Sequence, residues 1–190
     1  MSAFEHVTAL LSFVYALALT HLLARIAELV VARERVRFSG LLALGMVNAV
    51  LMVFVNWLSL WDLRSVTSWD IASIAIQFLF AISVYIICAL VGPKMPDDST
   101  IDLEDFFWRQ RTYFYGAIII CLVLALLANL DFLKTPNTTL FVKENLGTIA
   151  LLIPSTLGLI SRNRTTQWAA GLCFLAMIVG FAIMFSSTLA

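Results

Sequence analysis

Three ionisable side chains share one face of the first long apolar segment. On a helix with about 100° per residue, Arg25 lies about 40° from His21 in one direction and Glu28 about 20° in the other. Histidine titrates close to neutral pH, with an unperturbed pKa of about 6.5. Ionisable residues inside a membrane often mark a path for ions or protons, so this stripe predicts such a path. The alternative is structural: Arg25 and Glu28 reach the interface and pair, and His21 binds another helix.

A second polar stripe follows in the next apolar segment. Asn48 and Asn56 lie among small and polar neighbours within about 80° of arc on one helical face. Gln77, in the third apolar segment, could join them. These amides predict either the lining of a pore or hydrogen bonds that join helices. The second interpretation is favoured, because interhelical hydrogen bonding is the ordinary use of such side chains in membranes.

No other set of residues predicts a reaction. The chain has no glycine-rich phosphate loop, no His-x-x-x-His or Cys-x-x-Cys motif and no nucleophile elbow. Its two histidines, His6 and His21, lie about 22 Å apart along one helix, which is too far to ligate one haem. Cys88, Cys121 and Cys173 all fall in apolar segments, so no disulfide is expected. We therefore expect neither enzyme activity nor a cofactor or metal site.

The composition places these residues in a membrane. Hydrophobic residues make up 62% of the 190 and charged residues 13%, against roughly 45–50% and 25% in an average soluble domain. So few polar residues could not cover the core of a soluble domain of this size. The 12 basic and 12 acidic residues cancel, which gives no reason to expect a nucleic-acid partner. The composition excludes soluble enzymes, secreted modules and disordered linkers.

Six apolar segments are long enough, or nearly so, to cross the bilayer, which takes about 20 residues of helix. The apolar runs are too long for barrel strands, so the sequence predicts an all-α bundle of six transmembrane helices in one domain, residues 1–190. The fifth segment is free of charge only over residues 146–160 and contains Pro154, which favours a kinked packing helix over a binding site. The predicted spans are residues 7–31, 40–62, 69–92, 113–130, 140–161 and 166–188.

The connection between the third and fourth spans contains a predicted helix, Ile101–Arg111. Acidic residues occupy its first turns, and Arg109 and Arg111 lie at its end, which suits the helix dipole. Phe106 and Phe107 are placed to enter the membrane interface. We expect a short cytoplasmic helix at the membrane surface that runs into the fourth span. The alternative is a gating element or a docking site for a cytoplasmic partner.

The distribution of Lys and Arg predicts the orientation. Eight of them lie in the first, third and fifth connections, three lie in the second and fourth, and the termini have none. The positive-inside rule then places those three connections in the cytoplasm and both termini outside.

Two faces of small residues predict close helix contacts and a homo-oligomer. One lies on the sixth span and includes Gly171, Ala176 and Gly180. The other lies on the first span and consists of Ala9, Ala16, Thr20, Ala24 and Ala27.

Two motifs resemble those of a group of uncharacterised small bacterial six-span inner-membrane proteins. They are Leu-Thr-His-Leu-Leu at residues 19–23 and Asp-Leu-Glu-Asp-Phe-Phe-Trp-Arg-Gln-Arg at residues 102–111. The resemblance implies a bacterial inner membrane. It implies no reaction, because that group has no established activity.

The sequence leaves two main hypotheses for the function. The first is a small homo-oligomeric channel or transporter for protons or cations, in which the first span lines or gates the path. The alternative is a non-catalytic, membrane-anchored interaction or sensor module without transport activity. An enzyme acting on lipids or quinones is the weakest hypothesis, because no paired acid and base are visible.

Overall fold

The computed structural model describes residues 3–66, 69–95, 99–133 and 138–186, and nearly all of them are helical. Short elements join the α-helices: the 3-10 helices η1 (Arg33–Arg35) and η2 (Leu60–Ser65) and the strands β1 (Val36–Arg37) and β2 (Ile101–Asp102). The predicted all-α class is confirmed. The α-helices in these ranges are α1 (Ala3–Val31), α2 (Gly40–Ser59), α3 (Ile71–Val91), α4 (Leu103–Leu133), α5 (Thr138–Glu144), α6 (Leu146–Ile160) and α7 (Arg164–Ser186).

The helices have the length and apolarity of membrane spans. Among the described residues, α1, α2 with most of η2, α3, α4 and α7 can each cross a bilayer, and α5 with α6 forms a further candidate bent by 65°. This confirms the predicted bundle of apolar helices, and the chain is an integral membrane protein.

Two spans differ from their predicted bounds. α4 begins at Leu103 and is continuous, so the predicted surface helix is its first part and not a separate element. Leu103 and Phe107 are buried, which holds this part against the bundle. The predicted fifth span is broken at Asn145, whose backbone leaves the helical region and whose buried side chain accepts a hydrogen bond from Asn129. α6 coincides with the charge-free residues 146–160.

Two of the helices begin directly after an aspartate whose carboxylate caps the helix N-terminus. Asp70 caps α3, and Asp102 starts α4 by accepting the backbone N–H groups of Glu104 (2.9 Å) and Asp105 (3.1 Å). These bonds satisfy N–H groups that have no partner inside the helix. α3 ends at Gly92, which precedes a proline that could not continue the helix.

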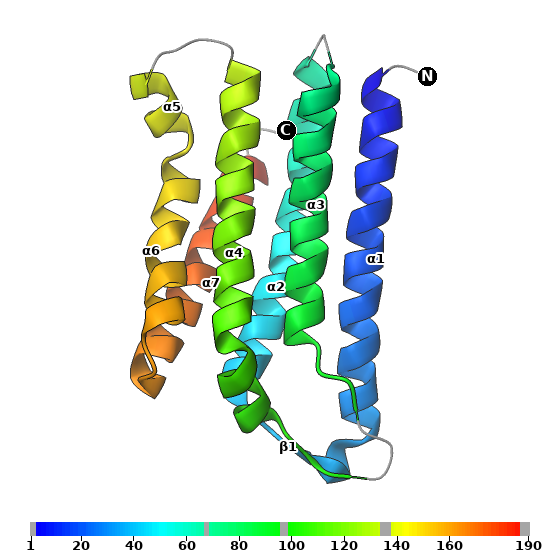
Figure 1. The fold of residues 1–190 in the computed structure, drawn as a ribbon, viewed down its shortest axis with the longest axis vertical. Helices are drawn as coiled ribbons and strands as arrows, with labels where there is room; N and C mark the ends of the chain where they lie inside the picture. Colours follow the sequence, from blue (N-terminus) through cyan, green and yellow to red (C-terminus); the bar gives the residue numbers. More distant parts are fainter. Residues whose placement is uncertain (1–2, 67–68, 96–98, 134–137, 187–190) are drawn as a thin grey trace.

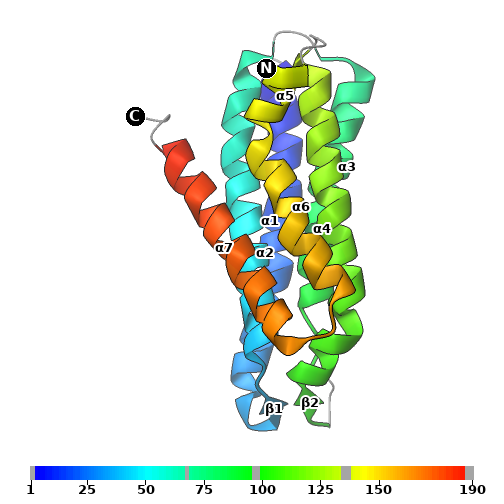
Figure 2. The same ribbon diagram turned by 90° about the vertical axis from the view of Figure 1, so that its left-hand side faces the viewer.

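The helices form two layers. In Figure 1, α1, α3, α4 and α6 stand side by side, and α2 and α7 lie behind them. Figure 2 shows that α7 leans away from the other helices toward its C-terminal end. We call the end with residues 32–39, 92–95, 99–102 and 161–163 the basic end and the opposite end the far end. Both ends of the described chain lie at the far end (Figure 1).

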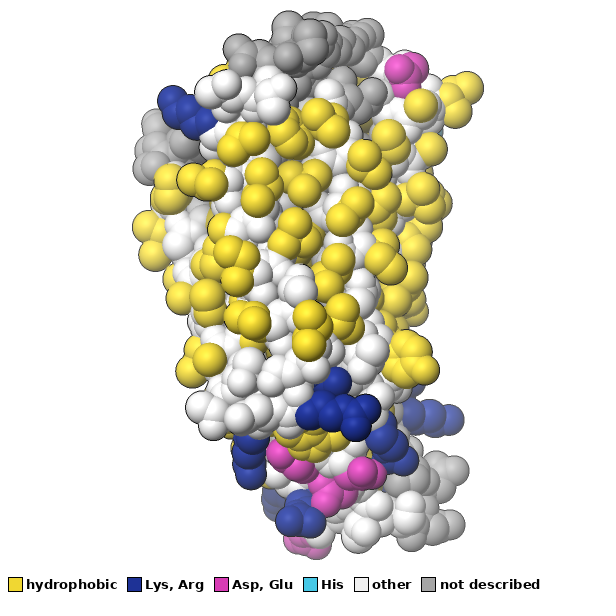
Figure 3. Space-filling view, turned by 60° about the vertical axis from the view of Figure 1, so that its left-hand side comes forward, with side chains coloured by type: hydrophobic (Ala, Val, Ile, Leu, Met, Phe, Trp, Pro, Cys, Tyr) yellow, Lys and Arg dark blue, Asp and Glu magenta, His cyan; other side chains and the backbone are white. Residues whose placement is uncertain are grey.

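The core is centred on α3, which packs against α1, α2 and α4. Apolar side chains also cover the outside of the bundle between its two ends (Figure 3), as a membrane protein requires. The deeply buried apolar side chains of these helices include Leu11, Tyr15, Ala18 and Leu22 of α1, Ala81, Val84, Ile87 and Cys88 of α3, and Ile118 and Cys121 of α4.

Gly158 lets α4 and α6 approach closely. A Cβ atom at this position would lie inside van der Waals contact with the ring of Tyr115, which is itself buried. Gly147, on the same helix, has no atom within 4 Å of such a Cβ. The two glycines therefore test whether the α4–α6 contact determines stability.

We expect Gly158→Ala to lower the free energy of unfolding by roughly 1–3 kcal/mol, because the added methyl overpacks the contact. Gly147→Ala should be neutral or stabilising by up to about 1 kcal/mol, since alanine is the better helix former. Thermal unfolding of the purified variants in detergent measures both. Equal losses in the two variants would contradict the role given to the close contact.

Candidate functional site

The polar stripe of the first span faces α3. Arg25 and Glu28 form an ion pair, as their spacing predicts, with Nη1 of Arg25 donating to both carboxylate oxygens at 3.0 and 2.8 Å. The stem of Arg25 packs on Gly92, where a Cβ would lie 3.0 Å from Cγ of the arginine. His21 is half-buried, and its ring centre lies 5.8 Å from that of Tyr85 on α3. The stripe is therefore occupied by contacts within the chain.

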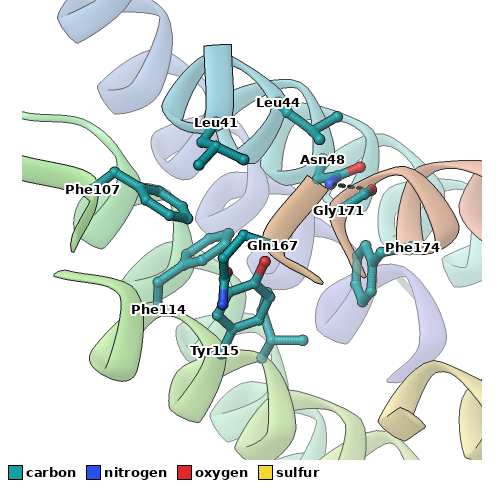
Figure 4. Close-up of a pocket in the computed structure, with 11 residues that line it drawn as sticks. Leu41, Leu44, Asn48, Phe107, Phe114, Tyr115, Gln167, Gly171 and Phe174 are labelled. Carbon is teal, nitrogen blue, oxygen red and sulfur yellow. Dashed lines mark hydrogen bonds between the residues drawn. The ribbon is translucent and has the colours of Figure 1, made fainter. Parts of the chain in front are cut away.

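The amides of the second stripe point to different partners. Asn48 is buried, and its Nδ2 donates to the carbonyl of Gly171 on α7 at 3.0 Å (Figure 4). Asn56 donates to the carbonyl of Met52 in its own helix at 2.7 Å. Gln77 is buried on α3. The structure thus places His21 against α3 and Asn48 against α7, and it does not bring the two stripes together.

A small cavity lies between α2, α4 and α7, beside Asn48 (Figure 4). Its volume is about 10 Å³, which is room for about one water molecule. Tyr115, Gln167 and several aromatic and aliphatic side chains complete its lining. Neither this cavity nor a second one of about 10 Å³, beside Gln110 and Arg111, is lined by the ionisable residues of α1.

Two amide oxygens at the first cavity have no hydrogen-bond partner among the described residues. They are Oδ1 of Asn48 and Oε1 of Gln167, and both are buried. The amide nitrogen of each side chain donates to backbone carbonyls, which cannot donate in return, so the two oxygens are fixed as acceptors. The cavity therefore suits a small hydrogen-bond donor such as water.

The C-terminus of α6 is capped from two neighbouring helices. Arg111 of α4 is buried, and its Nη1 donates to the carbonyls of Gly158 (2.7 Å) and Leu159 (2.9 Å) and to that of Ser161. Gln167 of α7 donates to two of the same carbonyls, at 2.9 and 2.6 Å. The last carbonyls of a helix lack partners within it and carry partial negative charge, so a guanidinium is a favourable cap.

Sequence reasoning missed this cap. Arg111 was interpreted only as the basic end of a surface helix, and Gln167 was not singled out. One signal was available: α6 has 15 residues and no basic residue in its last turn, so a cation from elsewhere was needed to balance its dipole. The sequence of α6 alone does not indicate which other helix provides that cation.

A polar cluster, which we call the clasp, joins the three connections of the basic end. Glu104 is its centre and accepts hydrogen bonds from Ser39 (2.7 Å) and Trp108 Nε1 (3.2 Å). Arg164 approaches the same carboxylate at 3.8 Å. Strands β1 and β2 pair in parallel beside it. We define the clasp as Arg37, Ser39, Asp102, Glu104, Trp108 and Arg164.

Asp102 is the second carboxylate of the clasp. The backbone N–H of Asp105 holds the pKa of its carboxyl below the usual value, helped by the N–H of Glu104 and by the charge of Arg37. Arg37 also forms an ion pair with it at 2.9 Å. The carboxylate is therefore ionised at neutral pH and joins the first connection to the third.

No metal site or known relative adds to this picture. Within the described ranges, no group of three or more His, Cys, Asp or Glu side chains is placed to bind a metal ion. No protein-family model, no curated protein and no solved structure matches the chain. The functional inference therefore rests on the geometry of the bundle.

We expect Arg111→Gln to lower the free energy of unfolding by roughly 1.5–3 kcal/mol, since it removes charge-assisted hydrogen bonds from buried carbonyls. The matched control is Arg109→Gln, which removes the same charge two positions before Arg111. Arg109 forms an exposed ion pair with Asp105. Its loss should be at most about 1 kcal/mol. Thermal unfolding in detergent compares the two. A larger loss in Arg109→Gln would overturn the capping role.

Proposed function

We propose that the chain is a non-transporting membrane module that presents its basic end to a partner. One observation carries this proposal: Arg25 pairs with Glu28, Asn48 binds the carbonyl of Gly171, and the cavity beside Asn48 holds about one water. A conducting path needs a continuous polar lining. The described interior contains short contacts between helices and not such a lining.

The shape of the basic end supports a docking role. α1 has 29 residues and α4 has 31, which gives lengths of about 44 and 46 Å against a hydrocarbon thickness of about 30 Å. Their ends project beyond the turn between α6 and α7 (Figures 1 and 2). The clasp fixes this projection with ion pairs and hydrogen bonds. A fixed, charged surface outside the hydrocarbon suits a soluble partner in the cytoplasm of a bacterial cell.

The side of the membrane can be tested by labelling. We expect a membrane-impermeant maleimide to modify Ala3→Cys at the far end of intact cells and to spare Glu34→Cys in η1 until the cells are opened. The excess of Lys and Arg at the basic end motivates this orientation. Both variants are made in Cys173→Ser, because the other two cysteines are buried. The reverse pattern would place the basic end outside.

The absence of transport is tested in reconstituted vesicles. We expect wild-type vesicles to show no more proton or cation flux than empty vesicles over a range of pH and potential, with an ionophore as positive control. The physical reason is the lack of a wide polar path in the bundle. A flux that His21→Ala abolishes and His6→Ala retains would contradict the proposed non-transporting function and establish a path along α1.

A homo-oligomeric channel or transporter is the second candidate, and one observation favours it. The small face of α1 points away from the bundle, and all five of its residues are exposed: Ala9, Ala16, Thr20, Ala24 and Ala27. Small faces of this kind let a helix of a second copy approach closely. A path between copies would then run along α1, and the vesicle experiment decides between the two candidates.

A further inference from the structure

The guanidinium of Arg111 is only partly used by the chain. Among the described residues, its hydrogen bonds all start from Nη1 and end on carbonyls of the α6 terminus. An arginine carries five N–H donors, so Nη2 and Nε still have three to offer. These donors suit an anion, because the carbonyls that bind Nη1 do not neutralise the charge of the side chain.

A second arginine lies beside the first. Arg162 is exposed in the turn between α6 and α7, and it directly follows Ser161, whose carbonyl accepts a hydrogen bond from Arg111. No carboxylate of the described ranges forms an ion pair with either. The three carboxylates at the start of α4 bind elsewhere: Asp102 pairs with Arg37, Asp105 pairs with Arg109, and Glu104 accepts hydrogen bonds within the clasp. Two arginines therefore meet at the end of α6, and neither has an ion-pair partner among the described carboxylates.

An apolar track leads to this pair along the outside of α6. Ile153, Leu157 and Ile160 repeat at helical spacing and are half exposed or more. Figure 3 shows Lys and Arg side chains below the apolar surface on the side of α4 and α6, with Asp and Glu gathered among them. Basic side chains thus lie next to the apolar surface at this end of the bundle.

We propose that Arg111 and Arg162 bind the phosphate of an anionic phospholipid whose acyl chain lies along Ile153, Leu157 and Ile160. Guanidinium and phosphate form paired, charge-assisted hydrogen bonds. Basic pockets between transmembrane helices on the cytoplasmic side are recurrent sites for anionic head groups. The site goes beyond the proposed docking role and stands whether or not a protein partner binds. The lipid phosphate would be the counter-ion of Arg111 and Arg162.

The test uses the purified full chain in mixed micelles, with bound phosphatidylglycerol and phosphatidylcholine counted by native mass spectrometry. The wild type should bind phosphatidylglycerol in preference to phosphatidylcholine. Arg162→Gln should weaken that binding about tenfold, as loss of a charge-assisted bond predicts. Arg109→Gln removes the same charge from a guanidinium already paired with Asp105 and should change binding by no more than about twofold.

Two outcomes would overturn the site. Equal weakening in Arg162→Gln and Arg109→Gln would mean diffuse attraction to the basic end. Inorganic phosphate is then added as competitor at constant ionic strength. Displacement of the lipid at matching concentrations would identify a free phosphate as the ligand, whereas retention of the lipid supports the acyl track. Arg162 is exposed, so its replacement should leave thermal unfolding unchanged, and that measurement accompanies the binding series.

Discussion

The carbonyl groups at the end of α6 are the constraint on which the arrangement of the bundle depends. A buried backbone carbonyl without a hydrogen-bond partner costs about 1–3 kcal/mol, and the last carbonyls of α6 have no partner within the helix. Arg111 and Gln167 satisfy these groups from α4 and α7, so three helices are joined at one point. The position of α7 follows from this junction. Its next contact, between Asn48 and Gly171, holds α7 against α2.

The polar chemistry of the chain is concentrated at the basic end. The α6 cap and the clasp lie there, and together they connect all three turns of that end through hydrogen bonds and ion pairs. At the far end α5 bends away at Asn145, and α7 diverges from its neighbours. A bundle that is tightly joined at one end and looser at the other is suited to holding a surface in place. This contrast is the main physical support for a docking module.

Much of the fold could be predicted because helix length and apolarity are local properties. The apolar segments predicted the spanning helices, and the spacing of Arg25 and Glu28 placed them on one face as a pair. The continuity of α4 and the break at Asn145 depend on packing and on a side-chain bond from another helix. The candidate site was harder still. The partner of Asn48 lies 123 positions along the chain, and no periodicity in α2 indicates which helix will face it.

The lean of α7 gives the molecule unequal widths at its two ends. The helices are close together near Gln167 and separate toward the far end, so the cross-section widens in that direction (Figure 2). A solid of this shape occupies more area in one leaflet than in the other. Neighbouring lipids must tilt or spread to fill the difference, and the energy of doing so depends on the curvature of the sheet. The divergence of a single helix therefore makes the area that the chain occupies differ between the two leaflets.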